Sequence, residues 1–272
     1  MIQDQSNQNW NQWLAGVIDG DGYFYIDTKN IARCEITVGI DDEYMLQKIK
    51  NKIPGSCKLR SGAKAIRLRI SSKEAMKNLV ERVNGEIRYQ VRQKQFEIVC
   101  NHFEIPYLPP KTESLNFENG YLSGLFDSDG TICFSISKTS QQDSQIKGEA
   151  GKIARLQNAR GYHQLQIRIS SKNREFLQLL IDAYGFGKIY QQKANLKIKH
   201  PNSLYHWTCQ NKNDIDQFLN YFNTQTFYSI KKKRLFLVAK YLELKSKKAH
   251  LALADQSSLR KIWCLFCQKW YS

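Results

Sequence analysis

The chain has 272 residues, 42% of them hydrophobic, which is enough apolar material for one large domain or two smaller ones. No apolar run reaches the roughly 18 residues that a membrane-spanning helix needs, so we expect no membrane partner. Lys and Arg number 41 against 25 Asp and Glu. The resulting net charge of +16 favours a polyanionic partner, above all a nucleic acid. The polar N-terminus lacks the basic and apolar regions of a secretion signal.

The first predicted element is a helix with an acidic motif, and this motif occurs twice. Residues 13–26 read WLAGVIDGDGYFYI, and residues 121–136 read YLSGLFDSDGTICFSI. Both copies run from an aromatic residue through Leu, a small residue, Gly and two apolar residues to Asp-small-Asp-Gly. Asp21 and Asp129 occupy matching positions, 108 residues apart. Repetition of this kind predicts two copies of one structural unit.

A second match further along the chain supports the duplication. The segment that starts at Leu68 aligns without gaps with the one that starts at Trp207, an offset of 139 residues. Both contain apolar residues at i, i+3, i+4 and i+7, the pattern of an amphipathic helix. Each half is predicted as helix, two strands, helix, two strands, helix, helix. The expected strands are 23–29, 32–40, 56–60, 65–71, 130–137, 162–170, 187–192 and 204–210, and the expected later helices are 42–52, 73–84, 88–102, 173–184, 212–222 and 230–244.

Three segments connect or extend these repeats. Residues 105–117 contain Pro106, Pro109 and Pro110, and are predicted as a stiff linker between an N-terminal half, 1–104, and a C-terminal half, 118–272. Residues 138–161 are polar and aperiodic, which predicts a long loop. The tail from Lys245 to Ser272 is predicted to contain one more helix.

The predicted strands alternate between apolar and polar residues. Ile66, Leu68 and Ile70 alternate with Arg67 and Arg69, which places one face on the core and the other in solvent. The polar face could be an ordinary solvated surface. It could also contact DNA bases, because Arg and Gln side chains suit the guanine and adenine edges in the major groove. The positive charge and the repeat favour the base-contacting interpretation.

The chemistry of the repeated motif points to a metal site. Small residues four positions apart, such as Gly16 and Gly20, lie on one helix face and permit close approach of a second helix, which would bring Asp21 and Asp129 side by side. Carboxylates at helix C-termini, and carboxylates close to each other, are both unfavourable. A divalent cation such as Mg²⁺ relieves both costs. The alternative, a plain helix interface with solvated acids, does not explain two copies with matched flanks.

The two motifs, LAGVIDGDG and LSGLFDSDG, resemble the LAGLIDADG motif of homing endonucleases, in the single-chain form that carries it twice. The resemblance extends over roughly residues 10–245. It implies an α+β fold of two pseudo-symmetric αββαββα repeats. Their antiparallel sheets would form a saddle over DNA, with the paired motif helices at the centre.

The resemblance also assigns roles to residues of the motifs. The last acids, Asp21 and Asp129, would bind the divalent metal, and the residues before them, Gly20 and Ser128, would supply carbonyl oxygens. The earlier acids of the two motifs would be structural; these are Asp19 and Asp127.

A basic residue near each scissile phosphate is a further implication of the resemblance. The matching positions are Arg92 and Lys231, which the ungapped alignment pairs independently. Arg92 departs from the commoner lysine, and it cannot lose its proton to act as a base. Lys231 could instead be one charge of the solvated run 231–234. Candidate DNA-contacting residues are Tyr25, Asp27, Lys29, Arg33, Glu35, Lys58, Arg60, Arg67, Arg69, Ser135, Ser137, Gln164, Gln166, Arg168, Lys188, Gln192, Lys197 and Lys199.

The expected activity is that of a monomeric homing endonuclease. It would hydrolyse both strands of a long, non-palindromic double-stranded DNA target with Mg²⁺, and Mn²⁺ or Ca²⁺ could occupy the same site. An RNA maturase that binds structured intron RNA with the same basic surface is the alternative. A DNA-binding regulator with a degenerate active site is disfavoured, because Asp21 and Asp129 are intact. The expected location is a mitochondrion or chloroplast, with the gene in an organelle intron.

Overall fold

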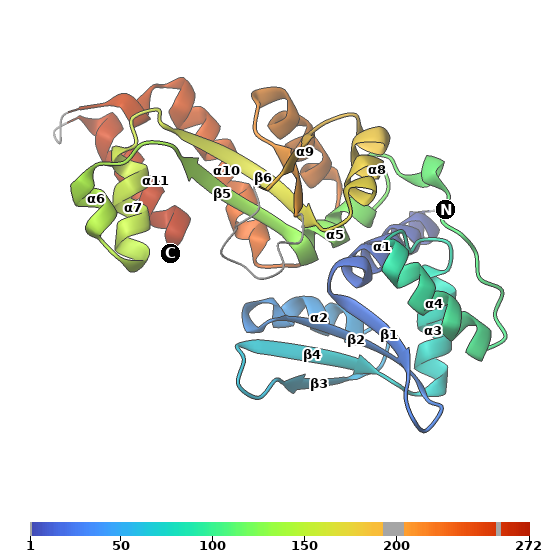
Figure 1. Cartoon of the computed structure of the whole chain (residues 1–272). Helices are drawn as coiled ribbons and strands as arrows, with labels where there is room; N and C mark the ends of the chain where they lie inside the picture. Colours follow the sequence, from blue (N-terminus) through green and yellow to red (C-terminus); the bar gives the residue numbers. More distant parts are fainter. Residues whose placement is uncertain (1, 193–203, 254–256) are drawn as a thin grey trace. The chain divides into compact units, whose positions relative to one another are not determined.

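The computed structural model, drawn in Figure 1, describes residues 2–192, 204–253 and 257–272. The chain divides into two compact units. Unit 1 comprises Met1–Gly130 and Arg168–Ile230, and unit 2 comprises Thr131–Ile167 and Lys231–Ser272. Residues of the predicted C-terminal half occur in both units, so the units do not coincide with the two sequence repeats. In the ranges just given, no helix has both the length and the apolar character needed to cross a membrane.

The first repeat lies in unit 1 and contains the predicted elements in the predicted order. They are α1 (Ile2–Asp21), β1 (Gly22–Ile26), β2 (Ala32–Gly39), α2 (Glu43–Lys50), β3 (Ser56–Leu59), β4 (Ala65–Ile70), α3 (Lys73–Val83) and α4 (Gln90–His102). The strands form an antiparallel sheet in the order β1-β2-β4-β3. One face, with Ile36 and Leu68, is fully buried, and α2 and α3 cover strands of this sheet.

The second repeat has the same order of elements. It consists of α5 (Tyr121–Asp129), β5 (Gly130–Ile136), β6 (His163–Ser171), α8 (Arg174–Tyr184), β7 (Lys188–Gln191), β8 (Tyr205–Cys209), α9 (Lys212–Thr224) and α10 (Lys231–Ser246). Its sheet has the order β5-β6-β8-β7, so equivalent strands of the two repeats occupy the same places in their sheets. The prediction of an α+β fold with two αββαββα repeats is therefore confirmed.

Several predicted element boundaries differ from the structure by a few residues, and two of the differences have a clear cause. Strand β1 ends at Ile26 because Asp27 starts a turn, in which its Oδ1 accepts hydrogen bonds from the backbone of Lys29 and Ile31, each 2.9 Å long. Helix α4 begins at Gln90 because a distant carboxylate, not a neighbouring residue, binds the preceding backbone N–H groups.

The prediction of a loop at 138–161 is wrong. This segment contains α6 (Gln141–Gln145) and α7 (Gly148–Asn158), and α7 packs against α11 (Ser258–Tyr271). The Gln157 carbonyl accepts a hydrogen bond from Arg260 Nη1 at 2.6 Å, and Gln157 Nε2 donates to the Cys264 carbonyl at 3.2 Å. The polar sequence of α7 shows little periodicity, which is why it predicted a loop. The helix is stabilised by a partner helix about 100 residues away in the sequence. Helix α11 itself confirms the helix predicted in the tail.

The segment predicted as a linker has little regular structure. Apart from the short 3₁₀ helix Thr112–Ser114, residues 105–117 contain no helix or strand. The side chain of Asn84 fixes one end of this segment, accepting from Leu108 N at 2.9 Å and donating to the Pro106 carbonyl at 2.8 Å.

Unit 2 has an aromatic core around His163. The imidazole ring of His163 lies 5.4 Å from the Trp263 ring and 5.8 Å from the Tyr241 ring, between centroids. Neither ring nitrogen has a hydrogen-bond partner in the described part of the chain. Burial lowers the pKa of His163 to about 4, so this histidine is neutral at physiological pH.

Candidate active site on paired motif helices

The two motif helices, α1 and α5, pack with their backbones in close contact. A Cβ atom added to Gly124 would collide with the carbonyl group of Trp13, and one added to Gly16 would lie 2.6 Å from the Leu125 amide nitrogen. Only glycine leaves room for this approach at these two positions. The small residues of the motif therefore do what the sequence predicted, which is to pair the helices.

This packing brings the ends of the two motifs together. A Cβ atom on Gly20 would collide with the Ser128 side chain and would lie 3.1 Å from Asp129 Oδ2. The carboxylate of Asp129 thus lies against the backbone of the residue that precedes Asp21. Asp21 is half-buried and Asp129 is exposed. The last turns of α1 and α5 contain no basic residue, so each of the two acids lies at the negative end of a helix.

The earlier acid of the first motif has a structural role. Asp19 is buried, and its Oδ2 accepts hydrogen bonds from the backbone N–H groups of Arg88 and Tyr89 at 2.7 and 3.1 Å, just before α4. The Tyr121 hydroxyl of α5 donates to the same oxygen at 2.5 Å. Burial raises the pKa of Asp19 to about 6, although these hydrogen bonds and the charge of Arg88 oppose the rise.

Asp127 repeats this arrangement in the second motif. Its Oδ2 accepts from Trp13 Nε1 of α1 at 2.9 Å and from Tyr228 N at 2.7 Å, and its Oδ1 accepts from Ser229 N and Ser229 Oγ. Burial raises the pKa of Asp127 as well. Each motif helix therefore donates an aromatic side chain to the buried acid of the other. The expectation that Asp19 and Asp127 are structural agrees with this geometry.

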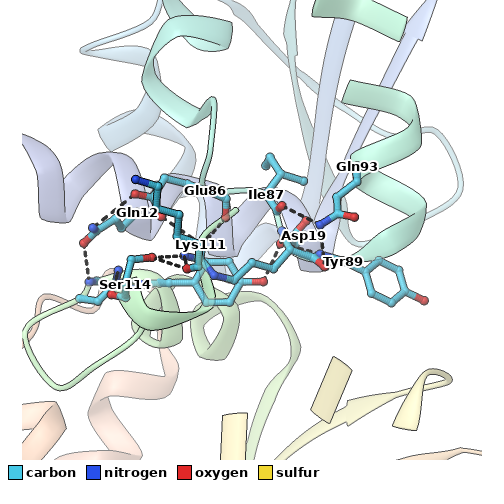
Figure 2. A network of polar contacts seen from close by, with 12 residues as sticks. Gln12, Asp19, Glu86, Ile87, Tyr89, Gln93, Lys111 and Ser114 are labelled. Carbon is cyan, nitrogen blue, oxygen red and sulfur yellow. Dashed lines mark hydrogen bonds and ion pairs between the residues drawn. The ribbon is translucent and has the colours of Figure 1, made fainter. Parts of the chain in front are cut away.

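A buried arginine extends the first of these networks to the linker (Figure 2). The Arg88 guanidinium lies 4.7 Å from the centre of the Tyr121 ring, and it donates to Glu86 Oε2 at 3.0 Å and to Ser114 Oγ at 2.7 Å. Gln12 Oε1 accepts from the Gly120 amide at 3.1 Å. The linker is thus bound to Arg88, and the residue before α5 is bound to Gln12 of α1. Sequence reasoning missed Arg88, because a single arginine in a basic chain gives no local signal.

Arg92 contacts the helix that carries the first motif. Arg92 lies in the first turn of α4, and its Nε donates to the Ile18 carbonyl at 3.1 Å, one turn before Asp21. Its Nη1 donates to Gln95 Oε1 at 2.9 Å. The guanidinium therefore supplies the positive charge that the last turn of α1 lacks. Lys231, in unit 2, is half-buried and is the first residue of α10, which agrees with its predicted place at a helix start.

The polar face of the first sheet contains a compact ion-pair cluster. Glu35 on β2 accepts hydrogen bonds from Arg69 Nε at 2.6 Å and from the Tyr25 hydroxyl at 2.9 Å, and Arg67 Nη1 lies 2.9 Å from its other oxygen. Partial burial alone would raise the pKa of Glu35, but the bonds from Arg69 and Tyr25 and the charge of Arg67 outweigh it and lower the pKa. Four predicted DNA-contacting residues therefore form one cluster.

The remaining candidates of the first sheet are exposed or lie beside it. Arg33 forms an ion pair with Asp27 at 2.5 Å, and Lys29 lies in the turn after β1. Lys58 and Arg60 are exposed at β3 and directly after it. The sequence prediction omitted Tyr23 and Thr37, although their alternation with buried residues places them on the same polar face.

The candidates of the second repeat follow the strands as predicted. Gln164, Gln166 and Arg168 alternate with buried residues along β6. The exposed candidates are Ser135, Ser137, Lys188 and Gln192, whereas Lys197 and Lys199 lie outside the described residues.

One hydrogen-bonded histidine in the second repeat was missed. His206 on β8 bonds to Ser170 Oγ at 2.8 Å through Nδ1 and to Gln192 Oε1 at 3.2 Å through Nε2. The strand-like alternation in the sequence YHWTC of β8 is the sequence signal for the position of His206.

The comparisons identify the family to which this architecture belongs. The sequence profile described as LAGLIDADG endonuclease matches residues 14–103 and 122–242, which include both motifs and most of both repeats. The chain therefore belongs to the LAGLIDADG endonuclease family. Paired motif helices and two four-stranded sheets are the fold expected from that membership.

Individual relatives agree with the family. The chain is 35% identical over 96% of its length to a probable intron-encoded endonuclease aI2 of Debaryomyces hansenii. It is 38% identical over 99% of its length to the intron-encoded RNA maturase bI4 of Saccharomyces cerevisiae. It spans 37% and 38%, respectively, of the lengths of these two relatives. The crystal structure of the LAGLIDADG homing endonuclease I-LtrWI bound to target DNA shares the fold, with a TM-score of 0.70, 13% identity, and coverage of 96% of this chain and 97% of that one.

Proposed function

We propose that this chain is a site-specific DNA endonuclease that hydrolyses both strands of a long, non-palindromic target with the help of a divalent cation. The observation that supports the proposal is the position of Asp129 Oδ2 against Gly20, the residue before Asp21, at the C-terminal ends of α5 and α1. Two carboxylates at the negative ends of two packed helices lower the stability of the fold. The two buried acids, Asp19 and Asp127, accept hydrogen bonds from the surrounding backbone.

The oxygen donors at this end of the helices fit Mg²⁺, which prefers hard ligands and retains several waters. Asp21 and Asp129 would hold the cation, together with the carbonyl groups of Gly20 and Ser128. Within the described ranges, no group of three or more His, Cys, Asp and Glu side chains could bind a metal. The remaining ligands would therefore be water and DNA phosphate oxygens. When bound, a divalent cation lowers the pKa of a water ligand and stabilises a leaving oxygen.

The chain's own residues would bind and orient the DNA. Arg92 is fixed by the Ile18 carbonyl, and a fixed guanidinium beside a phosphate stabilises the charge that develops there. Because Arg92 keeps its proton, it orients and stabilises without acting as a base. We assign the equivalent role in the second repeat to Lys231. The polar sheet faces, with Arg67, Arg69 and Gln166, would contact bases in the major groove.

The target follows from the two-repeat organisation. We propose residues 1–104 and 118–272 as two halves that each contact one half-site, joined by the linker 105–117. Because the halves differ in sequence, the two half-sites differ as well. The relatives named as intron-encoded indicate that the gene lies in an intron, which we place in an organelle genome. The joined exon sequence that flanks such an intron is the expected target, and a monomer is sufficient to bind it.

The decisive experiment compares Asp21→Asn and Asp129→Asn with wild type on that exon-junction DNA. Each substitution keeps the size of the side chain but removes the charge that binds the cation. We expect each to reduce double-strand cleavage in Mg²⁺ by at least about a thousandfold, while DNA binding in Ca²⁺ persists. Glu81→Gln, at an exposed position of α3, is the matched control and should cleave normally. Wild-type rates in both Asp variants would rule out the proposed active site.

A second candidate function is assistance of intron RNA splicing. The similarity to a relative named as an RNA maturase, at 38% identity over nearly the whole chain, favours it. Splicing of the host intron in vitro, with and without the protein and without added DNA target, separates this function from cleavage. Asp21→Asn and Asp129→Asn should leave any splicing activity intact, because that activity needs binding and not phosphodiester hydrolysis by the protein.

A further inference from the structure

The positive charge of the chain is concentrated in unit 2. Its two segments contain 16 of the 41 Lys and Arg residues but only 4 of the 25 Asp and Glu residues. Unit 1 therefore holds 25 basic and 21 acidic residues, although it is more than twice as long and contains the candidate active-site acids. A surplus of this size in a small body indicates that unit 2 has a polyanionic ligand of its own.

Unit 2 also contains a cavity of about 420 Å³, which is within the size range of small-molecule sites, about 300–1,000 Å³. Strand β5 forms one wall, and helices α7, α10 and α11 supply side chains to the others. Helices α7 and α11 lie outside the αββαββα repeat, so the cavity is an addition to the basic fold. Three of the described lining residues are cationic, and none is Asp or Glu.

Two of the three cations are fixed by backbone carbonyl groups. Arg155 Nη1 on α7 donates to the carbonyls of Asp143 and Ile146, both at 3.2 Å. Arg234 Nη1 on α10 lies 3.5 Å from the Ile132 carbonyl of β5. These bonds use one nitrogen of each guanidinium, and an arginine has five N–H donors, so both groups can still bind an anion. Lys152, which is exposed one turn before Arg155, adds a third positive charge.

Three of the remaining lining residues are aromatic. Phe134 and Trp270 lie with ring centroids 4.6 Å apart and form its apolar floor. The half-buried Tyr271 lines the cavity beside them, and burial raises the pKa of its phenol, so the ring remains neutral. Aromatic side chains next to guanidinium groups match a molecule that is aromatic at one end and anionic at the other.

We propose that this cavity binds an unpaired nucleotide of single-stranded nucleic acid. The base would pack against Tyr271, and the phosphates would bind Arg155, Arg234 and Lys152. Proteins hold single strands in this way, with aromatic rings that stack on bases and a basic groove that follows the backbone. A base in a duplex is already stacked and paired, so it cannot enter without being extruded at a cost of a few kcal/mol. The cavity is therefore a site distinct from the polar sheet faces that would contact duplex DNA.

Binding of the full-length protein to four short probes tests the proposal. The probes are oligouridylate, oligothymidylate, an abasic deoxyribose-phosphate chain of the same length, and an unrelated DNA duplex. Fluorescence anisotropy is measured with EDTA present, so that nuclease activity does not interfere. Wild type should bind the probes with bases about tenfold more tightly than the abasic chain, because stacking contributes about 1–3 kcal/mol per base. Preference for oligouridylate identifies RNA as the source of the nucleotide, and preference for oligothymidylate identifies single-stranded DNA.

Three variants separate stacking from charge. Tyr271→Leu should abolish the preference for probes with bases and leave binding of the abasic chain unchanged. Lys152→Gln should weaken binding of all three single-stranded probes and reduce the dependence on salt. Lys261→Gln is the matched control, since this exposed residue of α11 does not line the cavity, and it should have a smaller effect than Lys152→Gln.

Two results would overturn the proposal. One is an abasic chain that wild type binds as tightly as oligothymidylate, and the other is Tyr271→Leu binding that retains the wild-type preference for bases. If Tyr271→Leu does not fold, photocrosslinking of wild type to a 4-thiouridine oligonucleotide gives the answer. Crosslinks should map to the C-terminal end of α11 or to β5, and crosslinks only elsewhere would contradict the proposal. Loss of DNA cleavage in Asp21→Asn does not bear on this outcome, so the two proposals fail separately.

Discussion

The hydroxyl group of Tyr121 on α5 donates a hydrogen bond of 2.5 Å to Asp19 on α1, and Trp13 on α1 donates one of 2.9 Å to Asp127 on α5. Trp13 and Tyr121 occupy the same position of the repeated motif, as do Asp19 and Asp127. Each helix therefore donates a hydrogen bond from an aromatic side chain to the buried acid of the other helix. These buried acids lie two residues before the acids that we place in the active site. A buried acceptor that loses its donor costs about 1–3 kcal/mol.

Tyr121→Phe is expected to lower the free energy of unfolding by about 1–3 kcal/mol, because Asp19 loses one donor in a buried site. Chemical denaturation measures the change. Tyr23→Phe, which removes a hydroxyl from an exposed ring, should change stability by less than about 0.5 kcal/mol. Equal effects of the two substitutions would show that the bond to Asp19 contributes nothing.

Asp19 should make stability depend on pH. Burial raises its pKa from 3.8 to about 6, so the folded protein holds this proton more tightly than the unfolded chain does. The stability that results is full below pH 3.8 and is lost as the pH rises through about 6. Asp19→Asn removes this titration. We expect the stability of wild type relative to Asp19→Asn to fall by up to about 3 kcal/mol between pH 4 and pH 8. Urea unfolding across this range measures it, with Glu81→Gln as the control. Parallel pH profiles of wild type and Asp19→Asn would contradict the assignment.

Gly124→Ala should separate the motif helices. The added Cβ would collide with the backbone carbonyl of Trp13, which cannot move without displacing α1. We expect a loss of at least about 3 kcal/mol of stability, or failure to fold. Gly39→Ala is the matched control, because a Cβ there meets no atom within 4 Å. Thermal unfolding distinguishes the two, and a Gly124→Ala variant as stable as Gly39→Ala would show that the helices are not in backbone contact.

Glu35 is expected to orient Arg67 and Arg69 for contact with bases. Glu35→Gln removes the charge that fixes both guanidinium groups and also removes one negative charge from the sheet face that we propose to contact DNA. Non-specific affinity should therefore rise slightly, while discrimination against single base substitutions falls about tenfold at one or two base pairs. Binding to a set of singly substituted targets measures this. Glu43→Gln, at an exposed position of α2, serves as the control. A loss spread evenly over all positions would argue against a positioning role for Glu35.

The two DNA strands should be cut at different rates, since Arg92 and Lys231 differ in chemistry. We expect wild type to accumulate one nicked intermediate. Arg92→Ala and Lys231→Ala should each slow the cut of a different strand, by about a hundredfold. Strand-specific end labels on the same target resolve the two rates. Identical strand rates in wild type, together with identical nicking patterns in the two variants, would contradict the asymmetry.

The sequence alone determined the repeat, the order of elements and the pairing of the motif helices. Local signals were sufficient for these features. Each signal indicates which nearby residues are buried: the strand alternation at 65–71, the helical periodicity at 73–84, and the spacing of Gly16 and Gly20. The family resemblance pointed to Asp21 and Asp129 for the same reason, since their motif is contiguous.

Only the tertiary structure decided features that depend on distant partners. Helix α7 is stabilised by α11, so its own sequence predicted a loop. The structural role of Asp19 depends on Tyr121, Arg88 and Tyr89, which lie 69 to 102 residues away. The joining of Glu35 with Arg67 and Arg69 depends on the register between β2 and β4. A sequence pattern indicates whether a residue is buried, whereas the fold determines which distant group forms a hydrogen bond with a buried polar side chain.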